Sequence, residues 1–142
     1  MPLRPGATLE NAQEIGVDRL PGLVGFKVTA LEENRVAAEL EVKPHLVAPN
    51  GYLHAATVIA LADTACGYGC RAHLPDGAEG FTTIELKANF LGTAREGTIQ
   101  TVATPAHMGS TTQVWDATVT RKSDGKAIAL FRCTQMILYP RR

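Results

Sequence analysis

The stretch from His54 to Ala72 constrains the fold most, because its residues are apolar or small on almost every side. Thr57, Asp63 and Thr64 are the exceptions that stand out within it. A helix without a polar face has to be buried, since it has no surface to present to water. We therefore expect a helix over residues 54–72 that lies at the centre of the molecule and needs cover on every side.

The segments around this helix carry the alternating pattern of strands. A short helix capped by Thr8 is expected first, over residues 9–15, and Leu20-Pro-Gly22 is expected to break the chain. The predicted strands span residues 25–31, 35–42, 81–90, 97–104, 111–120 and 127–138. This order predicts an α+β fold in which an antiparallel sheet wraps around a long central helix.

Length and charge restrict the class of protein. At 142 residues we expect a single domain over 1–142, with an N-terminal helical segment 1–19 and a core over 20–139. The formal net charge of zero predicts neither nucleic acid nor a membrane surface as a partner. No apolar run reaches membrane-spanning length, and the first residues lack the pattern of a signal peptide.

The cysteines indicate the compartment. Cys66, Cys70 and Cys133 are an odd set without the density of a disulfide framework, which favours reduced thiols in a cytoplasmic protein. No Cys-x-x-Cys pair or His-rich cluster accompanies them, so we predict small buried core residues and no metal site.

Asp63 is the only charged side chain between Lys43 and Arg71. A carboxylate in such an apolar setting loses hydration and needs either a partner or a chemical role. Its residue type and setting therefore make it the first candidate for catalysis. From the residues alone, an equally good interpretation is a carboxylate that a backbone amide or hydroxyl satisfies, or one that points to solvent.

The start of the predicted helix is a second candidate site. The first amide N–H groups of a helix have no partner inside it and favour negative charge, so those near Ala55 could polarise a carbonyl group. The alternative is that Asn50 or water caps them and that His54 is a packed histidine. Thr82 and Thr83, on the next strand, could direct hydroxyls into a cleft, or could simply reflect the β-propensity of threonine.

The spacing of His54 and Asp63 restricts how they can cooperate. Nine residues of helix separate them by about 14 Å along the axis and place them on opposite faces. They cannot meet within one chain. If both serve one site, they come from different subunits, and the chain forms a homodimer with two equivalent sites.

Several short motifs occur in a fixed order along the chain. They are Gly51-Tyr-Leu-His54-Ala-Ala56, Asp63 nine residues after the histidine, the strand Thr83-Ile-Glu-Leu-Lys-Ala-Asn89-Phe-Leu91, Gly109-Ser-Thr111 and Asp124-Gly-Lys126. Over residues 20–139 the chain resembles the hotdog-fold acyl-CoA thioesterases of the PaaI-like (phenylacetate-degradation) family. The resemblance implies a hydrolase that acts on acyl-CoA, without a cofactor because CoA is part of the substrate, and a homotetramer of two dimers.

The resemblance also implies roles for individual residues. Asp63 would be the general base that activates water, or the nucleophile that attacks the thioester. The Ala55 amide would polarise the thioester carbonyl, beside His54 and Asn50, and Thr83 would orient Asp63 or the water. Substrate contacts are expected at Gly51, Ala56, Asn89, Gly109 and Ser110, with Lys87, Arg95 and Arg121 as candidates for the CoA phosphates.

The chain departs from the family pattern at two places. The His-Gly-Gly of the family is His54-Ala55-Ala56 here, which keeps the amide donor but adds two methyl groups. The Asn or Gln of the family falls on Ala48, and Asn50 follows two residues later. These changes leave open two alternatives to hydrolysis, namely a non-catalytic acyl-CoA-binding module and an enoyl-CoA hydratase. The acyl group also remains open.

Overall fold

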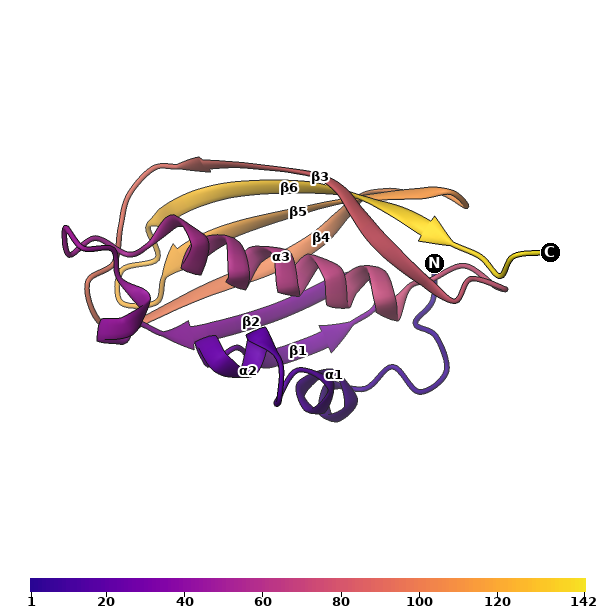
Figure 1. Ribbon diagram of the computed structural model, residues 1–142, viewed down its shortest axis with the longest axis horizontal. Coiled ribbons are helices and arrows are strands. Elements are labelled where there is room, and N and C mark those ends of the chain that lie inside the picture. Colours follow the sequence, from indigo (N-terminus) through magenta and orange to yellow (C-terminus); the bar gives the residue numbers. More distant parts are fainter.

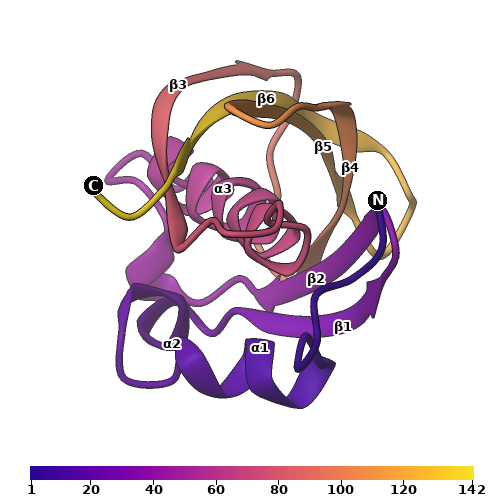
Figure 2. The same ribbon diagram turned by 90° about the vertical axis from the view of Figure 1, so that its right-hand side faces the viewer.

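A six-stranded sheet curves around one long helix in the computed structural model, which describes residues 1–142 (Figures 1 and 2). The helices are α1 (Leu9–Ile15), α2 (Leu20–Val24) and α3 (Ala55–Ala72), with a 3₁₀ turn, η1, at Pro44–Leu46. The strands are β1 (Lys27–Glu32), β2 (Arg35–Glu41), β3 (Gly80–Phe90), β4 (Thr98–Met108), β5 (Thr112–Arg121) and β6 (Ala127–Leu138). The strand order is β1-β2-β4-β5-β6-β3, with every neighbouring pair antiparallel. The predicted α+β fold is confirmed.

The central helix α3 is buried along most of its length, as its sequence predicts. Leu61, Ala62 and Ala65 are fully buried, and Trp115 of β5 is the largest side chain that is completely covered. A Cβ atom at Gly69 would lie 2.5 Å from the Trp115 ring, so glycine lets the ring pack directly against the helix backbone. No helix of the chain combines the length and the apolar character that crossing a bilayer requires.

A buried histidine anchors the C-terminal end of α3. Nδ1 of His73 lies 2.8 Å from the Gly69 carbonyl oxygen, and Nε2 accepts the backbone N–H of Asn34 at 2.9 Å. Gln113 of β5 donates to the His73 carbonyl at 2.9 Å. Burial lowers the pKa of His73, which favours the neutral ring that this pair of hydrogen bonds requires. The C-terminal end of α3 is thereby fixed to the β1–β2 turn and to β5.

Three details differ from the expectations. The predicted break at residues 20–22 is wrong, because Pro21 is tolerated in the first turn of α2, which ends at Gly25 with a φ of 79°. η1 lies between β2 and α3, where the sequence predicts neither a helix nor a strand. β4 continues to Met108, beyond the predicted end at residue 104, by passing through a bulge between Pro105 and His107.

β3 forms one edge of the sheet and pairs only with β6. Its unpaired side carries free backbone N–H and C=O groups, and it exposes Ile84, Leu86 and Phe90, followed by Leu91. A long, apolar edge strand is a template for pairing with another chain. The fold therefore leaves one surface suited to self-association.

Candidate active site

His54 caps the N-terminus of α3 and leaves one amide free. Its Nδ1 accepts the N–H of Ala56 at 2.9 Å, and its carbonyl oxygen accepts the N–H of Thr57 at 2.9 Å. The N–H of Ala55, the first residue of the helix, makes no hydrogen bond. This exposed donor, at the positive end of the helix dipole, is suited to a carbonyl oxygen or an oxyanion.

The loop before α3 is held in a tight turn. The Asn50 side chain accepts the N–H of Tyr52 at 3.1 Å, Gly51 has a φ of 84°, and Ala48 donates to the Tyr52 carbonyl at 2.7 Å. Thr93 Oγ1 accepts the N–H of Leu53 at 2.9 Å. Asn50 therefore shapes the turn, whereas His54 caps the helix.

An apolar groove of about 450 Å³ lies beside the free Ala55 amide. Its lining side chains come from the loop before α3, the first turn of the helix and the end of β3, and they include Tyr52, Val58, Phe90 and Leu91. The Arg95 guanidinium lies 4.9 Å from the centre of the Tyr52 ring, at cation–π distance. The groove can take an apolar group whose carbonyl oxygen points at Ala55.

Asp63 is half-buried and incompletely satisfied. Its Oδ1 is buried without a hydrogen-bond partner, and burial raises the pKa of the carboxyl group above its ordinary value of 3.8. Unpartnered buried polar atoms cost free energy and are rare in native proteins, where functional sites are a common exception. No backbone amide or hydroxyl of the chain satisfies this oxygen. The interpretation of Asp63 as a carboxylate satisfied by such a group therefore does not hold for Oδ1.

Thr83 lies on the face of β3 that turns toward α3. Its hydroxyl donates to Gln135 Oε1 at 2.7 Å, and the fully buried Gln135 amide lies 3.4 Å from Cys133 Sγ. Phe81 packs near Gly67. Thr83 lies two residues beyond Phe81 on the strand, and Asp63 lies about one helical turn before Gly67 on the helix.

The remaining predicted contacts are spread over the chain. Gly51 and Ala56 belong to the loop and helix start near the groove, and Arg95 of the β3–β4 connection lies over Tyr52. Lys87 and Asn89 instead line the outer face of the sheet. Gly109 and Ser110 form the β4–β5 turn, where Gly109 donates to Thr112 and Ser110 accepts from Tyr139. Arg121 is engaged by Asp124 at 2.8 Å and by the Thr93 carbonyl at 3.0 Å. One chain does not bring these residues into a single site.

The nearby cysteines are unsuited to nucleophilic chemistry. A hydrogen bond with Cys133 and burial raise the pKa of Cys66 well above its usual range, and burial raises that of Cys70 to about 12. Both thiols are therefore protonated near neutral pH, whereas the reactive form of a cysteine is the thiolate. No cluster of three His, Cys, Asp or Glu side chains is placed to hold a metal ion.

Sequence reasoning did not identify the groove or Gln135. The groove combines Tyr52 with Phe90 and Leu91, which are nearly forty residues apart, so local periodicity carries no sign of it. Gln135 did leave a signal, because it falls in phase with buried Cys133 and Ile137 on β6. A polar residue at a core-facing strand position indicates a buried hydrogen-bond network.

Comparison with known proteins identifies similar sequences and folds. The family model described as the thioesterase superfamily matches residues 50–128. The chain is 30% identical to the 1,4-dihydroxy-2-naphthoyl-CoA hydrolase of Listeria monocytogenes, over 78% of this chain and 89% of that protein. It is 28% identical to the Escherichia coli enzyme of the same name, over 92% and 95%. A crystal structure of a Haemophilus influenzae thioesterase superposes with a TM-score of 0.90 at 25% identity, covering 98% of this chain and 96% of that one.

Removal of the Asp63 charge should stabilise the fold at neutral pH. Burial raises the pKa of Asp63 in the folded state above its ordinary value of 3.8. The contribution of this carboxyl group to the free energy of unfolding is therefore fully present below pH 3.8, and it is lost as the pH rises through the raised pKa. Asp63→Asn is expected to raise the Tm at pH 7, with the difference from the parent vanishing near pH 3. Thermal unfolding across this pH range measures the effect.

Asp76→Asn, which removes one negative charge from an exposed turn, is the matched control. If Asp63→Asn and Asp76→Asn shift the Tm alike at every pH, burial does not penalise the Asp63 carboxylate.

Proposed function

Because this chain belongs to the thioesterase superfamily, we propose that it hydrolyses an acyl-CoA thioester to a carboxylic acid and CoA. The hotdog thioesterase predicted from the sequence is confirmed at the level of the superfamily and fold. The phenylacetate-type subfamily stays a prediction. The observation that carries the proposed reaction is the buried, unpartnered Oδ1 of Asp63 in a helix whose first amide is free.

The proposed site is shared between two subunits. Ala55 and Asp63 are eight residues apart, about 12 Å along the helix axis, which is too far for one thioester group to reach both within a chain. The exposed edge of β3 offers a surface for a twofold dimer. In such a dimer, the Ala55 amide of one subunit faces Asp63 of the partner subunit. The tetramer of two dimers remains a prediction from the resemblance.

The proposed reaction begins with the thioester carbonyl oxygen on the Ala55 N–H and the apolar part of the substrate in the groove. Asp63 of the partner subunit takes a proton from water, and the resulting hydroxide adds to the carbonyl carbon. The Ala55 N–H stabilises the oxyanion of the tetrahedral intermediate. The intermediate collapses, the C–S bond breaks, and the CoA thiolate takes up the proton. The raised pKa of Asp63 favours this general-base role.

Other side chains support these two groups in the proposed mechanism. His54 holds the first turn of α3, since its ring and carbonyl take the N–H groups of Ala56 and Thr57 and leave that of Ala55 for substrate. Gln135 Oε1 accepts the hydrogen bond that the Thr83 hydroxyl donates, so the Thr83 oxygen remains an acceptor for the attacking water. Tyr52 and Phe90 in the groove favour aromatic acyl groups among the candidate substrates.

Two substitutions test the roles of Asp63 and Ala55. Asp63→Asn removes the base and should lower kcat/KM by about 10²–10⁴-fold. Ala55→Pro removes the free N–H, and proline is well tolerated at the first helical position, so the rate should fall by about 10²–10³-fold in a folded protein. Release of CoA thiol from short-chain, medium-chain and aromatic acyl-CoA measures both.

Ala55→Gly, which keeps the N–H, and Asp76→Asn are the matched controls and should retain activity. Wild-type kcat/KM in Asp63→Asn contradicts the mechanism. Saturable binding of acyl-CoA by the unmodified protein without CoA release supports a binding module instead. Hydration of an enoyl-CoA that leaves the thioester intact supports a hydratase.

Disruption of the β3 edge should abolish both dimer and activity. Ile84→Lys places a charge on the edge strand, where Ile84 is 54% exposed in the single chain. We expect a monomer by sedimentation and loss of thioesterase activity, because each site needs both subunits. Val17→Lys, at a position 55% exposed in the α1–α2 connection, is the control. A fully active Ile84→Lys monomer contradicts the shared site.

A further inference from the structure

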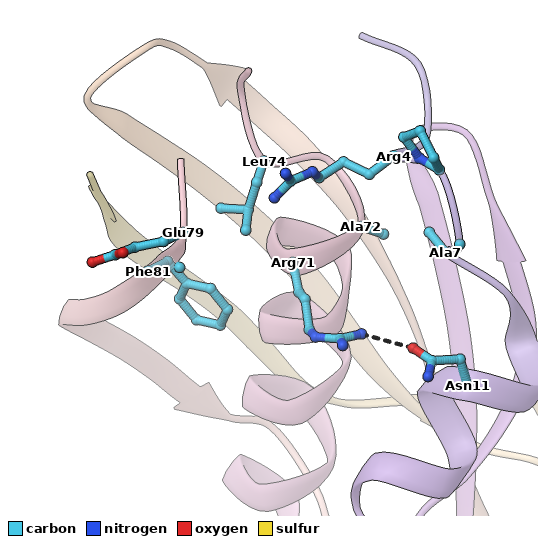
Figure 3. A pocket seen from close by; sticks show the side chains of 11 residues that line it. Arg4, Ala7, Asn11, Arg71, Ala72, Leu74, Glu79 and Phe81 are labelled. Carbon is cyan, nitrogen blue, oxygen red and sulfur yellow. Dashed lines mark hydrogen bonds between the residues drawn. The ribbon is translucent and has the colours of Figure 1, made fainter. Parts of the chain in front are cut away.

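A cavity of about 540 Å³ lies at the opposite end of α3 from the groove, where no role has been assigned. The N-terminal segment, α1, the last turn of α3 and the start of β3 enclose it (Figure 3). The charged, amide and aromatic side chains of its lining are Arg4, Asn11, Arg71, Glu79 and Phe81. It therefore combines two cations with an aromatic ring.

The two arginines of this cavity have no carboxylate partner. Arg4 donates through Nη1 to the Ala78 carbonyl at 3.2 Å, and Arg71 donates through Nη1 to Asn11 Oδ1 at 3.0 Å. Neither forms an ion pair, even though Glu79 lines the same cavity, whereas Arg132 pairs with Asp116. A guanidinium group has five N–H donors, so most donors of both remain available.

The arginines are placed by an ordered framework. Arg4 N donates to the Ala72 carbonyl at 2.8 Å, and Ala7 N donates to the Arg4 carbonyl at 3.0 Å, which seats the N-terminal segment on the end of α3. The bond from Arg71 to Asn11 ties α3 to α1. In Figure 3 the Arg4 side chain extends from the N-terminal segment across the cavity toward Leu74, whereas the Arg71 guanidinium points to Asn11. The Phe81 ring lies on the far side of Arg71 from Asn11.

We propose that this cavity binds an oxyanion, a phosphate or a carboxylate, that belongs to a ligand with an apolar portion. Two guanidinium groups with free donors match the charge and the hydrogen-bonding capacity of such a group. Phe81, Leu74 and Ala72 offer an apolar wall beside them. The net charge of the lining side chains stays positive when Glu79 is ionised.

The proposed dimer connects this oxyanion site with the groove, and this step rests on the proposed function. If two β3 strands pair antiparallel across a twofold axis, the start of one strand lies beside the end of the other. Phe81 of one subunit then approaches the Phe90 and Leu91 end of the partner's strand, where the groove lies. The anion would then be part of the thioester substrate, either a CoA phosphate or a carboxylate on the acyl group.

Direct binding tests the oxyanion site without any catalytic step. Inorganic pyrophosphate and glutarate are titrated by calorimetry into the full chain at constant ionic strength. Arg4→Gln and Arg71→Gln should each weaken binding of the preferred probe by about ten-fold or more. Arg19→Gln is the matched control, because the Arg19 side chain is exposed and donates only to the carbonyl of Asp18. Equal affinity in all four proteins, or no binding by the parent, overturns the inference, provided that thermal unfolding shows folded variants.

Kinetics then separate the two sources of the anion. If CoA phosphates occupy the cavity, Arg71→Gln should raise KM for butyryl-CoA and leave that for butyryl-N-acetylcysteamine unchanged. If an acyl carboxylate does, the variant should lose a preference for glutaryl-CoA over valeryl-CoA. Normal kinetics of the variant on all four thioesters overturn the link to the substrate. Arginine-dependent pyrophosphate binding without any hydrolysis keeps the oxyanion site and contradicts the proposed function.

Discussion

The packing of an apolar helix into the concave face of a curved sheet is the constraint on which the rest of the structure depends. α3 has no polar face, so the sheet must surround it, and the close approach of Trp115 at Gly69 fixes its position. His54 caps one end and His73 anchors the other. The ends of the helix are consequently rigid, which is what an amide donor at Ala55 requires if it is to bind a carbonyl oxygen without reorganisation.

Asp63 is the residue at which this packing lowers the stability of the folded state. A carboxylate oxygen without a partner inside an otherwise apolar helix weakens the folded state, and its raised pKa expresses the same cost. Within one chain the free Ala55 amide lies about 12 Å from Asp63 along the helix, too far for both to act on one thioester group. The proposed dimer brings the carboxylate of one subunit to the amide of the other.

The sequence was informative where local periodicity decides structure. The bounds of α1 were predicted correctly, those of α3 to within one residue, and the α+β arrangement followed from the apolar helix. The position of β3 at the sheet edge was not predictable, because pairing with β6 depends on contacts between residues about fifty apart. Tertiary structure likewise creates the groove between Tyr52 and Phe90, and it brings Arg4 and Arg71 to the same cavity.

Complementation between two inactive variants tests the shared site most directly. Asp63→Asn and Ala55→Pro are each expected to be nearly inactive as homodimers, but a mixed dimer contains one site with an intact amide and an intact carboxylate. Unfolding and refolding of an equimolar mixture should restore about a quarter of the parental activity, because half of the dimers are mixed and each has one working site. Activity no greater than that of the separately refolded variants, with mixed dimers present, would contradict a site built from two subunits.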